Sequence, residues 1–266
     1  MRKVAALVRA SWLHVLSYRL QLVFTLMGLL VAVVPVYFVS NALQPMMAQS
    51  IHEQGSQYFA FLIVGMLTYG FIATAVGALH ASLSSDISTG ALEAVLSTPT
   101  PLPVLMMGMI GQAFTHTAFR SAVLLLAAWA LGAQLVWSAA LVSLAILALL
   151  VIAYTGLGIF AASLVLAFKT TGPVPSAILG VSALLGGVYY PTSVIPSWLQ
   201  HLSALLPLTY GLRALRQSLL HGAPLSTLAS DVSILTAFAV VLLGSSLIVF
   251  SGALKYAKKQ GTLAHY

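Results

Sequence analysis

Six stretches of the sequence are long and apolar enough to cross a membrane as helices. A helix spans the roughly 30 Å hydrocarbon core of a bilayer with about 20 apolar residues. The stretches are residues 20–39, 58–79, 105–131, 138–168, 173–190 and 232–254. The third contains one charge, Arg120, and the fifth is short and begins with Pro173 and Pro175. The pattern predicts an all-α integral membrane protein with six transmembrane helices in one domain over residues 20–254.

The composition agrees with a chain that lies in a bilayer. Hydrophobic residues make up 60% of the 266 residues, charged residues make up 6%, and the mean hydropathy is +1.03. Soluble domains carry about a quarter charged residues, so a soluble globular protein is excluded. The sequence has no cysteine, which excludes disulfides and cysteine-held metals.

The basic residues predict how the chain is oriented. Eight of the eleven fall on one side of a six-span topology: four before the first span, Lys169 between the fourth and fifth, and three after the sixth. Cytoplasmic loops carry the excess of Lys and Arg. We therefore expect both termini in the cytoplasm of a multi-pass protein of the cell inner or plasma membrane. The net charge of +7 indicates topology and not a nucleic-acid partner.

Both ends of the chain are predicted to lie at the cytoplasmic surface. Residues 1–19 are too basic to insert, and their apolar side chains fall on one side of a helical wheel. We expect an amphipathic helix on the membrane interface, with Trp12 at the level of the headgroups. The alternative is a charged leader that only sets topology. Residues 255–266 form a basic cytoplasmic tail.

The predicted cytoplasmic loop over residues 84–99 has an unusual charge. Polar residues recur at helical spacing, from Asp86 in the first turn through Thr89 to Glu93, and Pro99 ends the pattern. This spacing predicts a short amphipathic helix. The loop has no Lys or Arg and holds two of the four acidic residues. We interpret it as a docking surface for a basic groove on a partner; a solvated loop helix without a partner is the alternative.

The segment between the fifth and sixth spans is apolar but broken by prolines. It predicts one helix from Pro196 to about Leu206 and a second over 210–220, capped by Thr209 and ended by Gly222. Eleven helical residues cover only about 16 Å, half of the hydrocarbon thickness. Residues 191–222 are therefore expected to form external re-entrant helices that pack over the bundle. Arg213 and Arg216 would then reach the outer headgroups; a mobile external loop is the alternative.

Residues for catalysis are scarce. All four carboxylates, Glu53, Asp86, Glu93 and Asp231, fall outside the predicted spans, and the seven histidines show no metal-ligand spacing. The sequence contains no Gly-x-x-x-x-Gly-Lys motif, so we expect no nucleotide hydrolysis by this chain. Arg120 is a functional candidate because it is a charge within a span. His116 shares its helix face. A structural role for this pair and a contact with substrate both remain open.

Two motifs, together with the order of the elements, resemble the type-2 ABC exporter permease family. The first motif runs from Thr89-Gly90 through Glu93 to Leu96-Ser-Thr98-Pro99. The second runs from Gly187 through Tyr189-Tyr190-Pro191, Pro196-Ser-Trp198 and Pro207 to Tyr210-Gly211 and Arg213. The resemblance covers nearly the whole chain. One departure is that three serines and Asp86 precede the first motif, where the family usually has basic residues or a mixture of acidic and basic residues.

The resemblance implies a division of labour. Residues 84–99 would be the coupling helix, inserted into a separate ABC ATP-binding subunit that binds ATP and Mg²⁺, so this chain is not itself an enzyme and holds no cofactor or metal. Two permeases would pair as a homodimer or a heterodimer, with the pathway between them. The coupling residues are Asp86, Thr89, Gly90, Glu93, Thr98 and Pro99; the external gate contains Pro191, Pro196, Trp198, Pro207, Tyr210, Gly211 and Arg213; the possible pathway residues are Tyr58, Tyr69, His116, Arg120, Tyr189 and Tyr190.

The favoured function is therefore ATP-driven export of an amphipathic, drug-like or lipid-like substrate by alternating access. Export of a polysaccharide or glycolipid is the alternative within the same class. An ATP-independent secondary carrier would need an ion or proton site within the spans, and the absence of carboxylates there disfavours it. A membrane enzyme is disfavoured for want of catalytic clusters. Aromatic residues on the pathway would suit such a substrate, although lipid contact and helix packing explain them equally well.

Reversing one charge tests the coupling helix. Glu93→Arg should leave the protein folded and inserted, because the residue lies outside the predicted spans. It should abolish stimulated ATP hydrolysis by the co-purified ATP-binding subunit, because a cation would face a basic groove. Normal transport by this variant would contradict the docking hypothesis.

Overall fold

The computed structural model describes residues 19–88, 102–168 and 173–259. Within these ranges the chain is entirely helical, as predicted, and contains no strand. The long helices are α2 (Arg19–Ile51), α3 (Tyr58–Ser88), α5 (Leu102–Ala130), α6 (Ala140–Phe168) and α10 (Leu225–Lys259). The shorter elements are α7 (Val174–Leu185), α8 (Ser197–Ser203), α9 (Pro207–His221) and the 3₁₀ turns η1 (Trp137–Ala139) and η2 (Thr192–Val194).

Four of the described helices are long and apolar enough to cross a membrane. They are Met27–Ile51, Tyr58–Ala81, Trp137–Leu164 and Leu225–Lys255, which correspond to the first, second, fourth and sixth predicted spans. The third predicted span coincides with α5. The fifth coincides with α7, a helix of only 12 residues that ends at Leu185 and not at Tyr190.

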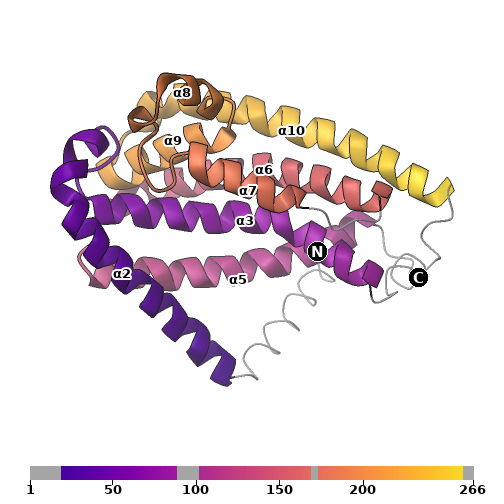
Figure 1. Ribbon diagram of the computed structural model, residues 1–266, viewed down its shortest axis with the longest axis horizontal. Coiled ribbons are helices and arrows are strands. Elements are labelled where there is room, and N and C mark those ends of the chain that lie inside the picture. Colours follow the sequence, from indigo (N-terminus) through magenta and orange to yellow (C-terminus); the bar gives the residue numbers. More distant parts are fainter. Residues whose placement is uncertain (1–18, 89–101, 169–172, 260–266) are drawn as a thin grey trace.

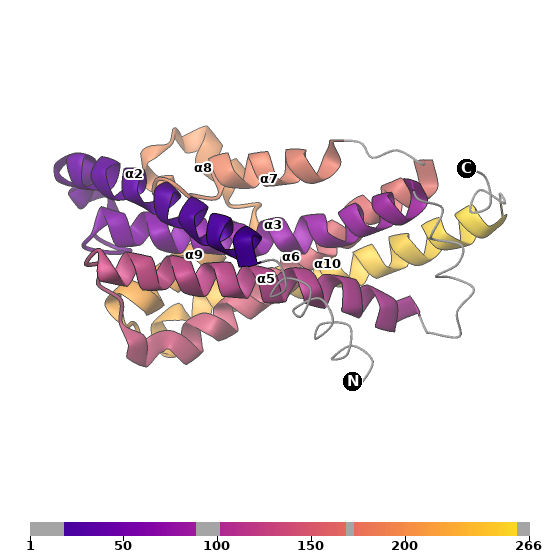
Figure 2. The same ribbon diagram turned by 90° about the horizontal axis from the view of Figure 1, so that it is seen from below.

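The long helices lie roughly side by side, and the short ones cover one end (Figure 1). Helix α6 packs mainly against α10 and α3, and α3 packs against α5 on another side. In both views α3 lies between α7 and α5 (Figure 2). Helix α2 crosses the bundle obliquely, and its first half separates from the other helices (Figure 1). The end that carries α8 and α9 is called the α9 end below.

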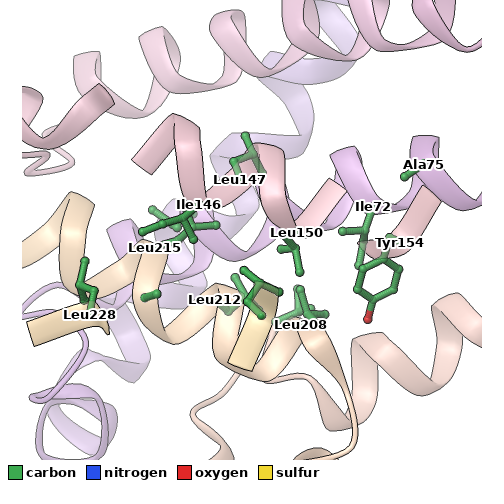
Figure 3. Packing of buried hydrophobic residues seen from close by; sticks show 14 of the residues in the cluster. Ile72, Ala75, Ile146, Leu147, Leu150, Tyr154, Leu208, Leu212, Leu215 and Leu228 are labelled. Atoms are coloured by element: carbon green, nitrogen blue, oxygen red, sulfur yellow. The ribbon is translucent and has the colours of Figure 1, made fainter. Parts of the chain in front are cut away.

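A single buried cluster joins α9 to the long helices. Figure 3 shows its members on α3, α6, α9 and α10. Leu150 and Tyr154 of α6 are fully buried, as are Leu208 and Leu212 of α9. The Tyr154 hydroxyl donates to Ser182 Oγ at 2.8 Å and so ties α6 to α7. Helix α9 is therefore part of the core and not a peripheral loop.

Glycines allow α6 to approach its two neighbours closely. A Cβ on Gly158 would overlap the carbonyl oxygen of Ala75 on α3. A Cβ on Gly156 would lie 2.7 Å from the carbonyl carbon of Leu242 on α10. Small residues at such crossings bring helix backbones into van der Waals contact, which drives helix association in lipid.

The structure corrects predicted boundaries in the proline-broken segment, where the first helix, α8, covers Ser197–Ser203 and neither begins at Pro196 nor reaches Leu206. Helix α9 begins at Pro207, after Leu206, so Thr209 is not its cap; the Thr209 hydroxyl donates to the Ser203 carbonyl at 2.6 Å instead. Proline at the first helical position has a suitable φ and lacks an N–H that would be unpaired anyway. The predicted end at Gly222 is confirmed, since this residue is left-handed with φ +67°.

Two acidic residues also lie differently from the prediction. Helix α3 continues to Ser88, so Asp86 lies in its last turn and not in the first turn of a separate helix. Helix α10 begins at Leu225, so Asp231 lies within an apolar helix and not outside it. The prediction that every carboxylate lies outside the spans is therefore wrong for Asp231.

Candidate functional site

Arg216 of α9 is the largest fully buried side chain in the described part of the chain, with 1% of its surface exposed. Its Nη1 donates to the Gly187 carbonyl at 2.8 Å and its Nη2 to the Val188 carbonyl at 2.9 Å. Nε and Nη2 both reach the Phe61 carbonyl at 3.3 Å, and Nη1 reaches Gln54 Oε1 at 3.4 Å. The guanidinium therefore joins α9 to α3, to the α2–α3 loop and to the turn after α7.

Local backbone geometry presents those carbonyls. Helix α7 ends at Leu185, and Gly187 follows with φ +80°, a left-handed conformation that side chains rarely adopt. The Gly187 and Val188 carbonyls thus lie outside the helix and can accept from Arg216. Gly65 of α3 makes the approach possible, because a Cβ there would overlap the Val188 oxygen and lie 2.7 Å from Arg216 Nη2.

The guanidinium of Arg216 remains a cation in this setting. Burial lowers the pKa of Arg216 to about 9, which still leaves it protonated at pH 7. Its Cζ lies 3.4 Å from the centroid of the Phe61 ring, whose face attracts a cation. The prediction that Arg216 reaches outward to the headgroups is wrong, because the protein encloses its side chain and its donors bind carbonyl oxygens there.

Arg213 lies one turn earlier on α9 and binds a different helix. Its Nε donates to Asp231 Oδ2 at 2.7 Å, and its Nη2 contacts the other carboxylate oxygen. The hydrogen bond with Asp231 raises the pKa of Arg213 above its ordinary value. The Tyr210 ring lies 5.5 Å from the Arg213 guanidinium carbon, and the Tyr210 hydroxyl donates to the Ala204 carbonyl. Arg213 is therefore paired with α10, while 41% of its side chain stays exposed; that it reaches the outer headgroups stays a prediction.

The other predicted gate residues divide by exposure. Pro207 and Gly211 are buried at the start of α9, where a Cβ on Gly211 would lie 2.9 Å from the Leu150 side chain. Pro191 is buried just before η2. Pro196 and Trp198 are exposed at the start of α8, Trp198 by 65%.

The predicted pathway residues form two groups on opposite sides of α3. Tyr58 donates to the Tyr189 carbonyl at 2.9 Å, Tyr190 donates to the Leu184 carbonyl, and Tyr69 packs against the buried cluster that contains Val188. These tyrosines lie between α3 and the segment after α7. Arg120, with His116 one turn before it, lies on α5 and lines a cavity of about 390 Å³ between α2, α3 and α5.

Comparison with known proteins identifies the family. The family model described as ABC-2 type transporter matches residues 2–220. The chain belongs to this family. Nodulation protein J of Rhizobium meliloti (strain 1021) is 24% identical over 188 residues, which cover 70% of this chain and 71% of that protein. Inner membrane transport permease YadH of Escherichia coli (strain K12) is 25% identical over 191 residues, 71% of this chain and 70% of YadH.

Family membership and the four apolar helices mark the chain as a multi-pass membrane protein. The predicted coupling residues Thr89, Gly90, Glu93, Thr98 and Pro99 lie outside the described residues. Asp86 is placed only as part of the α3 backbone.

Sequence reasoning missed several residues that build the α9 end. Gln54 and Gly65 were not singled out at all, and Gly187, Arg216 and Asp231 were named without the contacts that they make here. Two signals could have indicated them. Arginines at positions 213 and 216 of an apolar segment need acceptors, and Asp231 is the next carboxylate along the chain. A glycine within an otherwise apolar helix, such as Gly65, often marks a close backbone approach.

Removing the buried cation should destabilise the protein. Arg216→Met leaves the Gly187 and Val188 carbonyls without donors, which we expect to cost about 2–4 kcal/mol of unfolding free energy. Arg216→Lys keeps the charge but not the fork of donors, so we expect an intermediate loss. The measurement is the thermal unfolding midpoint of the purified protein, with Lys255→Met as the control for loss of a charge.

Substitution of two glycines of α3 tests the same carbonyl cluster independently. Gly65→Ala should also lower the midpoint, because the added Cβ overlaps the Val188 oxygen. Gly77→Ala on the same helix has no atom within 4 Å of the added Cβ and should not lower it. An Arg216→Met variant that unfolds at the wild-type temperature would show that the carbonyl cluster does not stabilise the fold.

Proposed function

We propose that this chain is the membrane permease subunit of an ATP-driven exporter that moves an amphipathic, drug-like or lipid-like substrate out of the cytoplasm or inner leaflet. The observation that carries the proposal is the ABC-2 type transporter match over residues 2–220 of an all-helical chain. The relative in Escherichia coli is described as an inner membrane transport permease, which supports the same role here.

The energy source is a second protein. The sequence has no Gly-x-x-x-x-Gly-Lys motif to hold nucleotide phosphates. A separate ATP-binding subunit would therefore bind ATP and Mg²⁺ and dock on the coupling segment 84–99. A second permease, identical or related, completes the pathway.

The topology that fits this role has six spans with both termini in the cytoplasm. It gives the fifth span to α7 and places the α9 end on the outer side. Helix α7 is about 18 Å long, so the fifth crossing of a hydrocarbon core of roughly 30 Å must also include the non-helical residues that follow it, up to Tyr190. Helix α9 is about 22 Å long and does not cross the core on its own. Burial of Leu208, Leu212 and Arg216 against the bundle supports α9 as a re-entrant element that is enclosed by protein.

The contacts of α9 support its role in an external gate. Arg216 joins α9 to α3 and to the turn after α7, and Arg213 joins it to α10. A change in the angle between α3 and α10 must therefore move α9 or break one of these contacts. Alternating access needs such a link, because the coupling segment follows α3 at the other end of the helix.

Single cysteines test the topology cleanly, because the chain has none. Cysteine in place of Ser88, at the end of α3, should react with a membrane-impermeant maleimide only after the cells are opened. Cysteine in place of His201, which is exposed on α8, should react in intact cells. The reverse pattern would contradict the proposed orientation.

The α9–α10 ion pair should matter for transport more than for assembly. Arg213→Ala or Asp231→Ala should reduce ATP-dependent uptake of a fluorescent amphiphile into inverted vesicles while the ATP-binding subunit still co-purifies. The stability loss should be about 1 kcal/mol, since Arg213 is 41% exposed. Tyr210→Ala should act in the same direction through its contact with Arg213.

Exchanging the charges separates a gate contact from a packing defect. The Arg213→Asp, Asp231→Arg double variant retains the pair and should recover part of the transport that either single reversal loses. Loss of complex assembly in the alanine variants, in place of loss of transport, would contradict the gate assignment and favour a structural role.

A further inference from the structure

The cavity between α2, α3 and α5 is lined by hydrogen-bond donors on one side. Thr74 of α3 and Thr117, Arg120 and Ser121 of α5 supply its polar groups, and no carboxylate lines it. Thr74 and Thr117 lie 2.6 Å apart, hydroxyl to hydroxyl, and so join the two helices beside the cavity. Gly70 adds room, because no atom lies within 4 Å of where its Cβ would be. The cavity therefore has a positive, donor-rich wall.

Arg120 differs from the two arginines of α9. Within the described residues, neither the Arg120 guanidinium nor the Ser121 hydroxyl has a hydrogen-bond or ion-pair partner. Carbonyl oxygens accept hydrogen bonds from Arg216, and Arg213 is ion-paired with the carboxylate of Asp231. An arginine in an apolar helix is costly unless an acceptor faces it. Among the residues that the structure describes, none supplies an acceptor for the five N–H donors of Arg120.

The depth of Arg120 in the bundle fits a ligand that enters from the membrane. It lies ten residues before the end of α5 at Ala130, a distance of about 15 Å along the helix. A free inorganic anion would have to leave water to reach it. The headgroup of a membrane amphiphile already lies at the edge of the hydrocarbon layer and needs only a short displacement.

The remaining wall of the cavity is suited to an alkyl chain. Leu29 of α2, Met66 and Leu67 of α3 and Leu124 of α5 line it. Helix α2 crosses α3 and α5 obliquely and separates from them in its first half (Figure 1). An amphiphile with its charged group at Arg120 could therefore lay its tail along α2.

We propose that this cavity binds the anionic headgroup of a membrane amphiphile, with Arg120 as the main ligand and Ser121 as a second donor. A guanidinium binds phosphate and carboxylate through two parallel N–H bonds. The site lies within one copy of the chain and does not depend on the transport cycle proposed above. An anionic bilayer lipid and an anionic cargo share the required chemistry.

Lipid binding to the purified full-length chain tests the site. Native mass spectrometry in neutral detergent would compare phosphatidylglycerol with phosphatidylcholine of the same acyl chains. The anionic lipid should bind the wild type more tightly, and Arg120→Gln should weaken its binding by about tenfold, the order of effect expected for one charge-assisted contact. Ser121→Ala should weaken it less. Lys255→Gln removes a charge on α10, away from the cavity, and should leave binding unchanged.

The test has clear contrary outcomes. Equal retention of the two lipids by the wild type, or equal binding of phosphatidylglycerol by wild type and Arg120→Gln, would overturn the proposal. Competition by inorganic phosphate alone at concentrations similar to the lipid would overturn the amphiphile as the ligand. Thermal unfolding of Arg120→Gln in lipid-free detergent should match the wild type, because the guanidinium forms no hydrogen bond or ion pair with a described residue.

A second readout distinguishes the two sources of ligand. If the anionic amphiphile is cargo, it should raise the ATPase rate of the complex with the ATP-binding subunit, and Arg120→Gln should abolish that rise. If it is a bilayer lipid, it should bind without stimulation; both results support the site. Failure of the permease role would appear as a missing ATPase partner while lipid binding persists, so the two proposals fail separately.

Discussion

A buried guanidinium that has no carboxylate beside it must be surrounded by carbonyl oxygens, and this requirement shapes the α9 end of the protein. Backbone carbonyls within a helix are already used by the helix. Arg216 therefore needs a place where the chain leaves helical geometry, and the turn after α7 provides it through Gly187 and Val188. The short length of α7 serves this contact, because a helix continued to Tyr190 would use the Gly187 and Val188 carbonyls in its own hydrogen bonds.

Arg216 and Arg213 together determine how α9 can move. One side of the helix is hydrogen-bonded to α3 and the α7 turn, and the other is ion-paired to α10. The first contact is fully buried, whereas Arg213 is 41% exposed. A buried polar contact costs more to break than a partly solvated one. If the bundle rearranges, α9 should stay with α3 and α7 and move relative to α10.

The sequence predicts the helices well where apolar runs are long and uninterrupted. The runs at 58–79 and 138–168 became α3 and α6, and Gly222 ended α9 as glycine commonly does. The start of α9 was misjudged because Thr209 and Pro207 are both plausible first-turn residues. The length of α7 could not be predicted, because it depends on Arg216, which is distant in sequence but adjacent in space.

The candidate site was only partly predictable for the same reason. Residue type singled out Arg120, Tyr58 and Tyr189, but apolar periodicity does not tell which face of α3 each neighbouring helix covers. The structure places α7 and α5 on different sides of α3, and so separates the tyrosines from Arg120. A hydropathy scale assigns every arginine to the polar surface, so it could not predict that Arg216 is buried.

Arg120, Arg213 and Arg216 meet one physical demand in different ways. The charge of Arg216 is stabilised by backbone carbonyl dipoles, and that of Arg213 by the carboxylate of Asp231. No group in the described part of the protein forms a hydrogen bond or ion pair with Arg120. The Arg216 site depends on Gly65, where a Cβ would overlap the Val188 oxygen, and on the left-handed Gly187, whereas Arg213 is paired with Asp231 of α10. Helix α5 makes no such provision for Arg120 and leaves an open cavity beside it. In an apolar solvent that arrangement is stable when the acceptor comes from outside the chain, and this is why the cavity, and not the buried arginine, is the place to look for a ligand.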